Sequence, residues 1–191
     1  MINIITDIDD VILDTQAGVA QFLSQKGLDY SKDVKFNNGF IDFSQYWMPE
    51  FLTSQFFREL PILQYADEVL SRFKSKGYKI FALTSPPDIG YDNRLHQLNK
   101  EFPNMFDEII IKLGNKGEIL TDMIARHNLR ASDTYFIDDA PHNIKAAMIV
   151  PDLNIAWMEN VQNKAFPPES KDVVIVKNML DFEKHLKTKL G

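Results

Sequence analysis

Three acidic residues follow the first apolar run of the chain, at the point where a strand should end. The run 2–5 is rich in isoleucine and typical of a buried strand, and Asp7, Asp9 and Asp10 come directly after it. Ligands of open α/β sheets bind just beyond the carboxyl ends of the strands, so we expect Asp7, as the last strand residue, and Asp9 at the mouth of such a crevice. An isolated Asp-x-Asp is usually a solvated turn, and its interpretation therefore depends on the rest of the chain.

Three later segments also deliver polar groups where an expected strand ends. In chain order these groups are Thr84 with Ser85, Lys116 at the opening of a helix, and Asp138 with Asp139. Together with the first acidic group they suit phosphoryl transfer. One carboxylate would act as nucleophile, another as acid/base, hydroxyl and ammonium groups would hold the phosphate oxygens, and a metal ion would neutralise the clustered charge. Because the chain has no cysteine and no suitable histidine pair, oxygen ligands predict Mg²⁺ rather than zinc.

The elements that must position these groups alternate between strands and helices. We expect strands over 2–7, 78–83, 106–111, 134–139, 154–158 and 173–176, and helices over 15–26, 66–76, 91–102, 117–127, 141–147 and 180–189. Gly27 and Gly77 stand where the first two helices would end in a left-handed residue. Strands alternating with helices of this length predict an α/β fold with a Rossmann-like, doubly wound parallel sheet.

The segment 28–60 differs from the rest of the chain in its density of aromatic residues. It has little strand character, so it predicts a small helical insertion over the edge of the sheet. We therefore expect an α/β core domain over 1–14 and 66–191 and a small helical cap over 15–65. The aromatic residues are Phe36, Phe40, Phe43, Tyr46, Trp47, Phe51, Phe56 and Phe57.

Composition narrows the functional classes. The 191 residues, 45% hydrophobic and 25% charged, suit one domain with a modest insertion. A net charge of −6 argues against a general nucleic-acid or membrane-surface binder. The chain begins without a basic and then apolar leader, and no apolar stretch reaches the ~18 residues of a membrane span. These features predict a cytoplasmic protein without a membrane partner.

The four polar groups resemble the four motifs of the haloacid dehalogenase (HAD) superfamily of phosphatases, in order and spacing. The matching residues are Asp7-Ile-Asp9-Asp10-Val11, Thr84-Ser85, Lys116 and Asp138-Asp139. The resemblance implies that Asp7 is the nucleophile that forms an aspartyl-phosphate and that Asp9 is the general acid/base. It implies that Thr84 and Lys116 hold the phosphate. It also implies Mg²⁺ bound by Asp7, the Asp9 backbone carbonyl and Asp139, with Asp138 acting through water or directed toward Lys116.

Within that superfamily the sequence is most similar to the 5′(3′)-deoxyribonucleotidases, over about residues 2–140. The similar segments are Phe56-Phe57-Arg58-Glu59-Leu60, Thr84-Ser85-Pro86 and Gly39-Phe40, and Phe51 stands where those enzymes have tryptophan. The resemblance implies a (deoxy)nucleoside monophosphate as substrate. It implies Phe40 and Phe51 as contacts of the base and Ser85 as a further substrate-binding residue.

The sequence departs from the nucleotidase pattern at four positions. Thr15 replaces an aromatic residue, Asp88 a lysine, Gly114 an arginine and Asp10 a glycine. Other small esters, a sugar phosphate or a nucleic-acid 3′-phosphate, therefore stay open as substrates. A dehalogenase is disfavoured because it would not need the acid/base or the metal carboxylates, and a non-catalytic binding or regulatory protein is the least favoured class. A homodimer, and the roles of Asp10 and His142, are left open.

Overall fold

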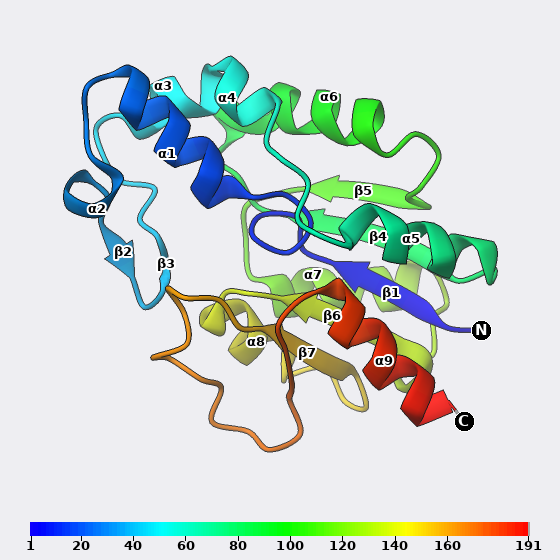
Figure 1. The fold of residues 1–191 in the computed structure, drawn as a ribbon. Coiled ribbons are helices and arrows are strands. Elements are labelled where there is room, and N and C mark those ends of the chain that lie inside the picture. The colour runs from blue at the N-terminus through cyan, green and yellow to red at the C-terminus, as the bar shows by residue number, and fades with distance from the viewer. Residues whose placement is uncertain (191) are drawn as a thin grey trace.

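The computed structural model describes residues 1–190, and its centre is a six-stranded sheet in which every neighbouring pair is parallel (Figure 1). The strand order is β5-β4-β1-β6-β7-β8. This order confirms the predicted α/β, doubly wound architecture, because the chain proceeds outward from β1 in both directions. The strands are β1 (Asn3–Thr6), β4 (Lys79–Thr84), β5 (Glu108–Ile111), β6 (Thr134–Asp138), β7 (Asn154–Met158) and β8 (Val174–Val176).

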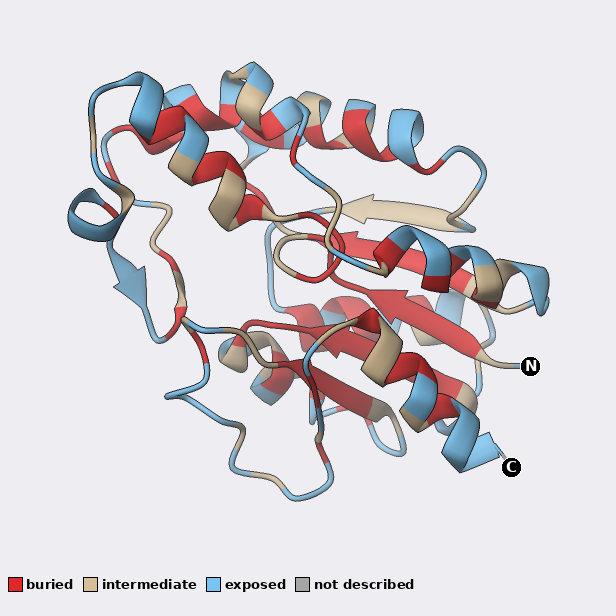
Figure 2. Ribbon diagram, viewed as in Figure 1, coloured by how far each residue is buried: buried red, intermediate tan, exposed pale blue. Residues whose placement is uncertain are grey.

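Helices cover both faces of the sheet because successive strand residues point to opposite sides. Ile4 and Ile80 pack into one apolar cluster with α5 and α9, whereas Ile5 and Phe81 pack into a second cluster with α7 and α8. Figure 2 shows the central strands buried and the outward faces of the helices exposed. The helices of the α/β part are α1 (Thr15–Gln25), α5 (Ala66–Ser75), α6 (Tyr91–Glu101), α7 (Lys116–Arg126), α8 (Pro141–Ala147) and α9 (Met179–Leu190), with short 3₁₀ turns at Asp88–Gly90 and Ala131–Asp133.

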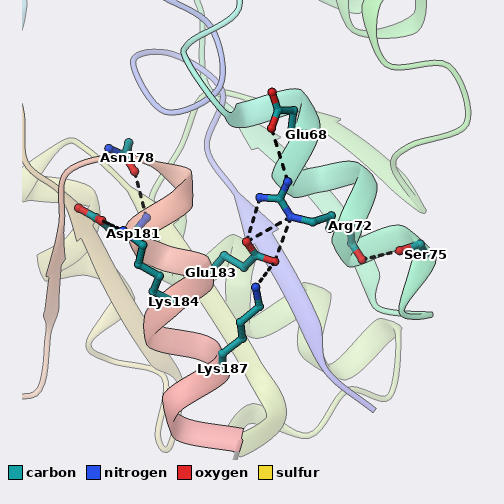
Figure 3. A network of polar contacts seen from close by, with 8 residues as sticks. All are labelled: Glu68, Arg72, Ser75, Asn178, Asp181, Glu183, Lys184 and Lys187. Carbon is teal, nitrogen blue, oxygen red and sulfur yellow. Dashed lines mark hydrogen bonds and ion pairs between the residues drawn. The ribbon is translucent and has the colours of Figure 1, made fainter.

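An ion-pair network joins α5 to α9 on the first of these faces (Figure 3). The Arg72 guanidinium donates to the Glu183 carboxylate, with Nη2 2.9 Å from Oε2, and Lys187 Nζ lies 3.0 Å from Glu183 Oε1. The Glu183 side chain is 2% exposed, so its charge is compensated by two cations rather than by water. This network holds two helices together away from the strand ends where the polar groups gather.

The insertion after α1 contains a small hairpin as well as helices. Its elements are α2 (Tyr30–Asp33), β2 (Phe36–Asn37), β3 (Phe40–Ile41), α3 (Met48–Thr53) and α4 (Gln55–Arg58). The insertion that was expected to be helical thus contains three short helices and, in addition, a two-stranded hairpin. Asn38 and Gly39 both have positive φ, 48° and 89°, as a tight two-residue hairpin turn requires, and Asn-Gly is the strongest short-range signal for such a turn.

Three aromatic residues of the insertion are buried in its interior, where they meet Phe22 of α1. The rings of Phe22, Trp47, Phe51 and Phe57 pack against one another at centroid distances of 5.4–6.4 Å. The same apolar cluster continues into the face of the sheet that contacts α5. The division into a core over 1–14 and 66–191 and a cap over 15–65 stays a prediction.

The insertion is also tied to α6 by amide side chains. Asn93 Nδ2 donates to the Leu52 carbonyl (2.9 Å), and Gln97 Nε2 donates to the Leu60 carbonyl (2.7 Å). These bonds satisfy carbonyl groups of the insertion that would otherwise lie buried without a partner. Within residues 1–190, no helix combines the length and apolar composition needed to cross a membrane.

Candidate active site

The carboxyl ends of the strands bring three of the predicted groups into direct contact. Lys116 Nζ lies 2.7 Å from Asp7 Oδ1 and 2.7 Å from Asp138 Oδ2. The lysine side chain is 1% exposed. Burial alone would lower the pKa of Lys116, but the two carboxylates outweigh it and raise that pKa, so the lysine carries its charge.

The local sequence explains how Lys116 reaches this position from the far side of the loop after β5. Asn115 is the N-cap of α7 and its side-chain oxygen accepts from Gly117 N at 2.9 Å, so the helix begins with Lys116. A Cβ on Gly117 would lie 2.2 Å from the Ala146 carbonyl oxygen. Only glycine therefore allows α7 to approach α8 closely enough to place Lys116 beside Asp138.

Asp7, Asp138 and Asp139 form a buried carboxylate cluster whose oxygens lie within 4.8 Å of one another. Burial raises the pKa of Asp7 to about 8, against the opposing charge of Lys116, and raises that of Asp139 well above its usual value. One lysine does not compensate these charges. An oxygen-only donor set with excess negative charge fits a hard divalent cation such as Mg²⁺, and it is Asp7 and Asp139, with the Asp9 carbonyl, that we expect to hold it.

Asp138 is directed toward Lys116. Its Oδ2 accepts from Lys116, while Oδ1 accepts from Ala140 N (2.8 Å) and Asn143 Nδ2 (3.1 Å). Of the two alternatives that the resemblance left for Asp138, the structure therefore has the contact with the lysine. Both oxygens are occupied, which fixes the direction of the Lys116 ammonium group.

Asp9 lies beside this cluster and is held by donors from three elements. Its Oδ1 accepts from Thr15 Oγ1 (2.6 Å) and from Arg94 Nη2, and its Oδ2 accepts from Thr84 Oγ1 (2.9 Å). The Thr84 hydroxyl thus donates to Asp9 in this structure, and its contact with a phosphate stays a prediction. Ser85 Oγ is buried without a partner in the described part of the chain and lies at the cavity wall.

A cavity of about 220 Å³ opens in front of Asp7 and Lys116. Its walls combine the acidic group with apolar side chains from the hairpin and the strand-end loops. Among the described residues that line it, Lys116 is the one lysine or arginine. The apolar and aromatic side chains that line the cavity include Phe40, Ile41, Phe43, Pro86, Leu113 and His142.

The two aromatic residues predicted to contact a base have different positions. Phe40 of β3 lines the cavity, and its ring lies 4.6 Å from that of His142 on α8. Phe51 is 0% exposed and packs between Phe22 and Phe57, away from the cavity lining. The prediction for Phe51 is therefore wrong, because the aromatic density of the insertion serves mainly its own interior.

Asp10, which had no predicted role, fixes the start of α1. Its backbone has φ 55°, and its Oδ1 accepts from Thr15 N (3.0 Å) and Gln16 N (3.2 Å). Burial and the nearby Asp9 raise the pKa of Asp10 to about 7. The residue thus satisfies backbone donors at the helix start, while contributing a further acidic group to the cavity wall.

Sequence reasoning missed three polar residues around the site. Asn160 Nδ2 donates to Asp139 Oδ2 (3.2 Å), and Asn163 Nδ2 donates to the Asp139 carbonyl (2.8 Å). Asn163 also lies against Gly39, whose missing Cβ would be 2.5 Å from Asn163 Cα. The third residue, Arg94, carried a detectable signal, since it stands one helical turn before the buried Leu98 on the same face.

The comparisons with known proteins give structural neighbours only. No family model matches the sequence, and no curated protein matches it. The structure superposes on a HAD phosphatase from Thermococcus onnurineus with a TM-score of 0.68 and 17% identity, over 97% of this chain and 98% of that one. It also superposes on the HAD-hydrolase YfnB from Bacillus subtilis, bound to magnesium, with a TM-score of 0.66 and 15% identity, over 97% of this chain and 98% of that one.

An L-2-haloacid dehalogenase is equally similar, with a TM-score of 0.68 and 13% identity over 98% of this chain and 99% of that one. The chain therefore has the Rossmann-like fold of HAD-superfamily hydrolases, a fold that carries both phosphatases and dehalogenases. Identities this low establish the fold alone. A fold does not fix the chemistry of a protein, which depends on the residues of its site.

Proposed function

We propose that this protein is a Mg²⁺-dependent phosphomonoester hydrolase that acts through an aspartyl-phosphate on Asp7. The observation that carries the proposal is the buried Asp7 carboxylate, held by Lys116 at the wall of a cavity and adjoining the oxygen cluster of Asp138 and Asp139. A nucleophile, a phosphate-neutralising cation and a metal donor set thus meet at one point.

The reaction would proceed in two steps, formation of the aspartyl-phosphate and its hydrolysis. An oxygen of Asp7 attacks phosphorus, the bond to the ester oxygen breaks, and the leaving alcohol takes a proton from Asp9. Asp9 then removes a proton from water as the water oxygen attacks phosphorus, which breaks the acyl-phosphate bond and regenerates Asp7. Lys116 and Ser85 would hold the non-bridging phosphate oxygens. Mg²⁺, bound by Asp7, Asp139 and the Asp9 carbonyl, would supply charge neutralisation between the carboxylates and the phosphate.

Replacing Asp9 should impair proton transfer selectively. We expect Asp9→Asn to lower kcat on an alkyl phosphate by about 10²–10⁴-fold, and far less on an aryl phosphate whose leaving group departs unprotonated. Steady-state kinetics over a series of leaving groups checks this. An equal loss across the whole series would show that Asp9 is not the acid/base.

For the substrate, we propose a nucleoside monophosphate, with the deoxy form preferred. Phe40 and Phe43 offer aromatic surface for a flat base, and Ile41 offers an apolar wall against which a ribose 2′-hydroxyl would be buried unpaired. The cavity of about 220 Å³ is below the ~300–1,000 Å³ typical of small-molecule sites, which favours a compact substrate or movement of the hairpin. A sugar phosphate is the alternative that the small volume supports.

Phe40 should affect binding of a nucleotide and not the chemistry. We expect Phe40→Ala to raise KM for a deoxynucleoside monophosphate by about tenfold or more, because stacking on a base contributes ~1–3 kcal/mol, and to leave a small aryl phosphate nearly unchanged. The matched control is Phe36→Ala in the paired strand of the same hairpin, since Phe36 is 39% exposed and does not line the cavity. Equal KM changes for both substrates would refute a base contact at Phe40.

The proposed function is tested by a screen of phosphate esters and 2-haloacids, with phosphate and halide release measured in parallel. We expect phosphate release that needs Mg²⁺, with deoxynucleoside monophosphates ahead of sugar phosphates. Halide release without phosphate release would instead establish a dehalogenase. A dehalogenase remains the second candidate because several of the structural neighbours are dehalogenases.

A further inference from the structure

Arg94 is a charged residue that is fully buried. It lies on α6, its side chain is 0% exposed, and its guanidinium carbon sits 4.3 Å from the centre of the Phe57 ring. Its Nε has no hydrogen-bond partner among the described residues, and Nη1 makes only a long contact of 3.4 Å with Gln97. An arginine buried with so few hydrogen-bond partners is costly, and its cation–π contact with Phe57 offsets only part of that cost.

The Arg94 guanidinium forms an ion pair with Asp9. Within residues 1–190 its ion pair is with Asp9 Oδ1, and no other cationic side chain pairs with Asp9. Lys116, the other buried cation nearby, is committed to Asp7 and Asp138. Among the described residues, Asp9 thus has acidic neighbours on the cavity side, and the cation that pairs with it comes from α6.

The donors around Asp9 are arranged so that its carboxylate has one orientation. Thr15 and Arg94 both donate to Oδ1, and Thr84 donates to Oδ2 from the end of the neighbouring strand β4. A planar guanidinium fixes the direction of a carboxylate more strictly than a hydroxyl, whose hydrogen rotates freely. Removing Arg94 would leave two rotatable hydroxyls and allow the Asp9 carboxylate to turn.

We propose that Arg94 is a positioning residue for proton transfer, which orients the Asp9 carboxylate from beneath the insertion without touching the substrate. The proposal rests on the proposed function, because it assigns Asp9 the acid/base role. It goes beyond that function by linking the acid/base to α6 and to Phe57 of the insertion. The rival interpretation is that Arg94 only fastens the insertion to α6.

The two interpretations differ in leaving-group dependence. Misplacing an acid/base by about an ångström costs on the order of 10²-fold, so we expect Arg94→Met to lower kcat on an alkyl phosphate by about 10- to 100-fold with little change in KM. An activated aryl phosphate should lose only a few-fold. Arg94→Lys, which keeps the charge, should recover part of the loss. A fastening role predicts an equal loss on every ester.

A double-mutant cycle gives an independent readout. If Arg94 acts through Asp9, the double variant of Asp9→Asn and Arg94→Met should be no slower on the alkyl phosphate than Asp9→Asn alone. Multiplying losses would overturn the proposal. Should Arg94→Met fail to fold, Arg94→Lys and Thr15→Val, which removes the second donor to Oδ1, carry the same leaving-group test; uniform losses in both would also overturn it.

Arg72 provides the matched control. It is likewise an arginine paired with a carboxylate nearly without exposure, Glu183, but it joins α5 to α9 away from the cavity lining (Figure 3). Arg72→Met should lower the melting temperature without altering leaving-group dependence. If wild-type protein releases phosphate from no ester, the proposed function fails; if it does and Arg94→Met behaves as Arg72→Met does, only the role of Arg94 fails.

Discussion

Asp7→Asn is expected to lose essentially all turnover, by more than about 10⁴-fold, on every phosphate ester that the wild-type protein hydrolyses. An amide oxygen cannot form the acyl-phosphate that the proposed first step requires. The loss should not depend on the leaving group, which distinguishes Asp7 from Asp9. Single-turnover reactions quenched in acid should show phosphate bound to the wild-type protein and none on the variant, and beryllium fluoride should label Asp7 alone.

The fold should survive this substitution. Burial raises the pKa of Asp7 to about 8, so its ionised form is destabilised in the folded protein near neutral pH without a metal. A neutral amide of the same shape removes that cost, and Lys116 keeps its contact with Asp138 at 2.7 Å. The melting temperature of Asp7→Asn in metal-free buffer should therefore equal or exceed that of the wild type. Near-native turnover by the folded variant would show that Asp7 is not the nucleophile.

Removal of divalent metal should abolish activity, and Mg²⁺ should restore it. Without a cation, burial and the neighbouring acidic groups disfavour the ionised forms of Asp7 and Asp139, and an ionised Asp7 is what attack on phosphorus requires. Mg²⁺ should also raise the melting temperature, by the equivalent of about 2.7 kcal/mol when its concentration is 100 times the dissociation constant. Phosphate release and thermal unfolding, each measured in chelator and then in excess Mg²⁺, check the two effects.

Two controls distinguish Mg²⁺ binding at the carboxylate cluster from a general effect of ionic strength. Sodium chloride at the ionic strength of the magnesium buffer should give neither effect, because screening alone does not bridge buried carboxylates. Asp139→Asn should remove most of the thermal shift, whereas Asp122→Asn on the exposed side of α7 should keep it; the Asp122 side chain is 71% exposed. Full activity in excess chelator would contradict a metal-dependent mechanism.

The sequence alone was sufficient for the layered fold. Apolar runs such as 78–83 and amphipathic segments such as 66–76 have periods that are properties of neighbouring residues, and the structure has β4 at Lys79–Thr84 and α5 at Ala66–Ser75. Because parallel strands end at one edge of the sheet, the order of elements also predicted that Asp7, Lys116 and Asp138 would meet there, as their contacts of 2.7 Å show.

The tertiary structure decided which polar groups face one another and which aromatic rings face the cavity. Phe40 and Phe51 are both phenylalanines of the insertion, yet Phe40 lines the cavity and Phe51 is 0% exposed. The difference is one of packing, since Phe40 follows the Asn38-Gly39 turn of the hairpin and Phe51 on α3 packs between Phe22 and Phe57. Thr84 and Ser85 are adjacent hydroxyls, and the alternation of strand side chains sends the first to Asp9 and leaves the second at the cavity wall. Arg94 meets Asp9 across 85 residues of chain, a contact that no local pattern encodes.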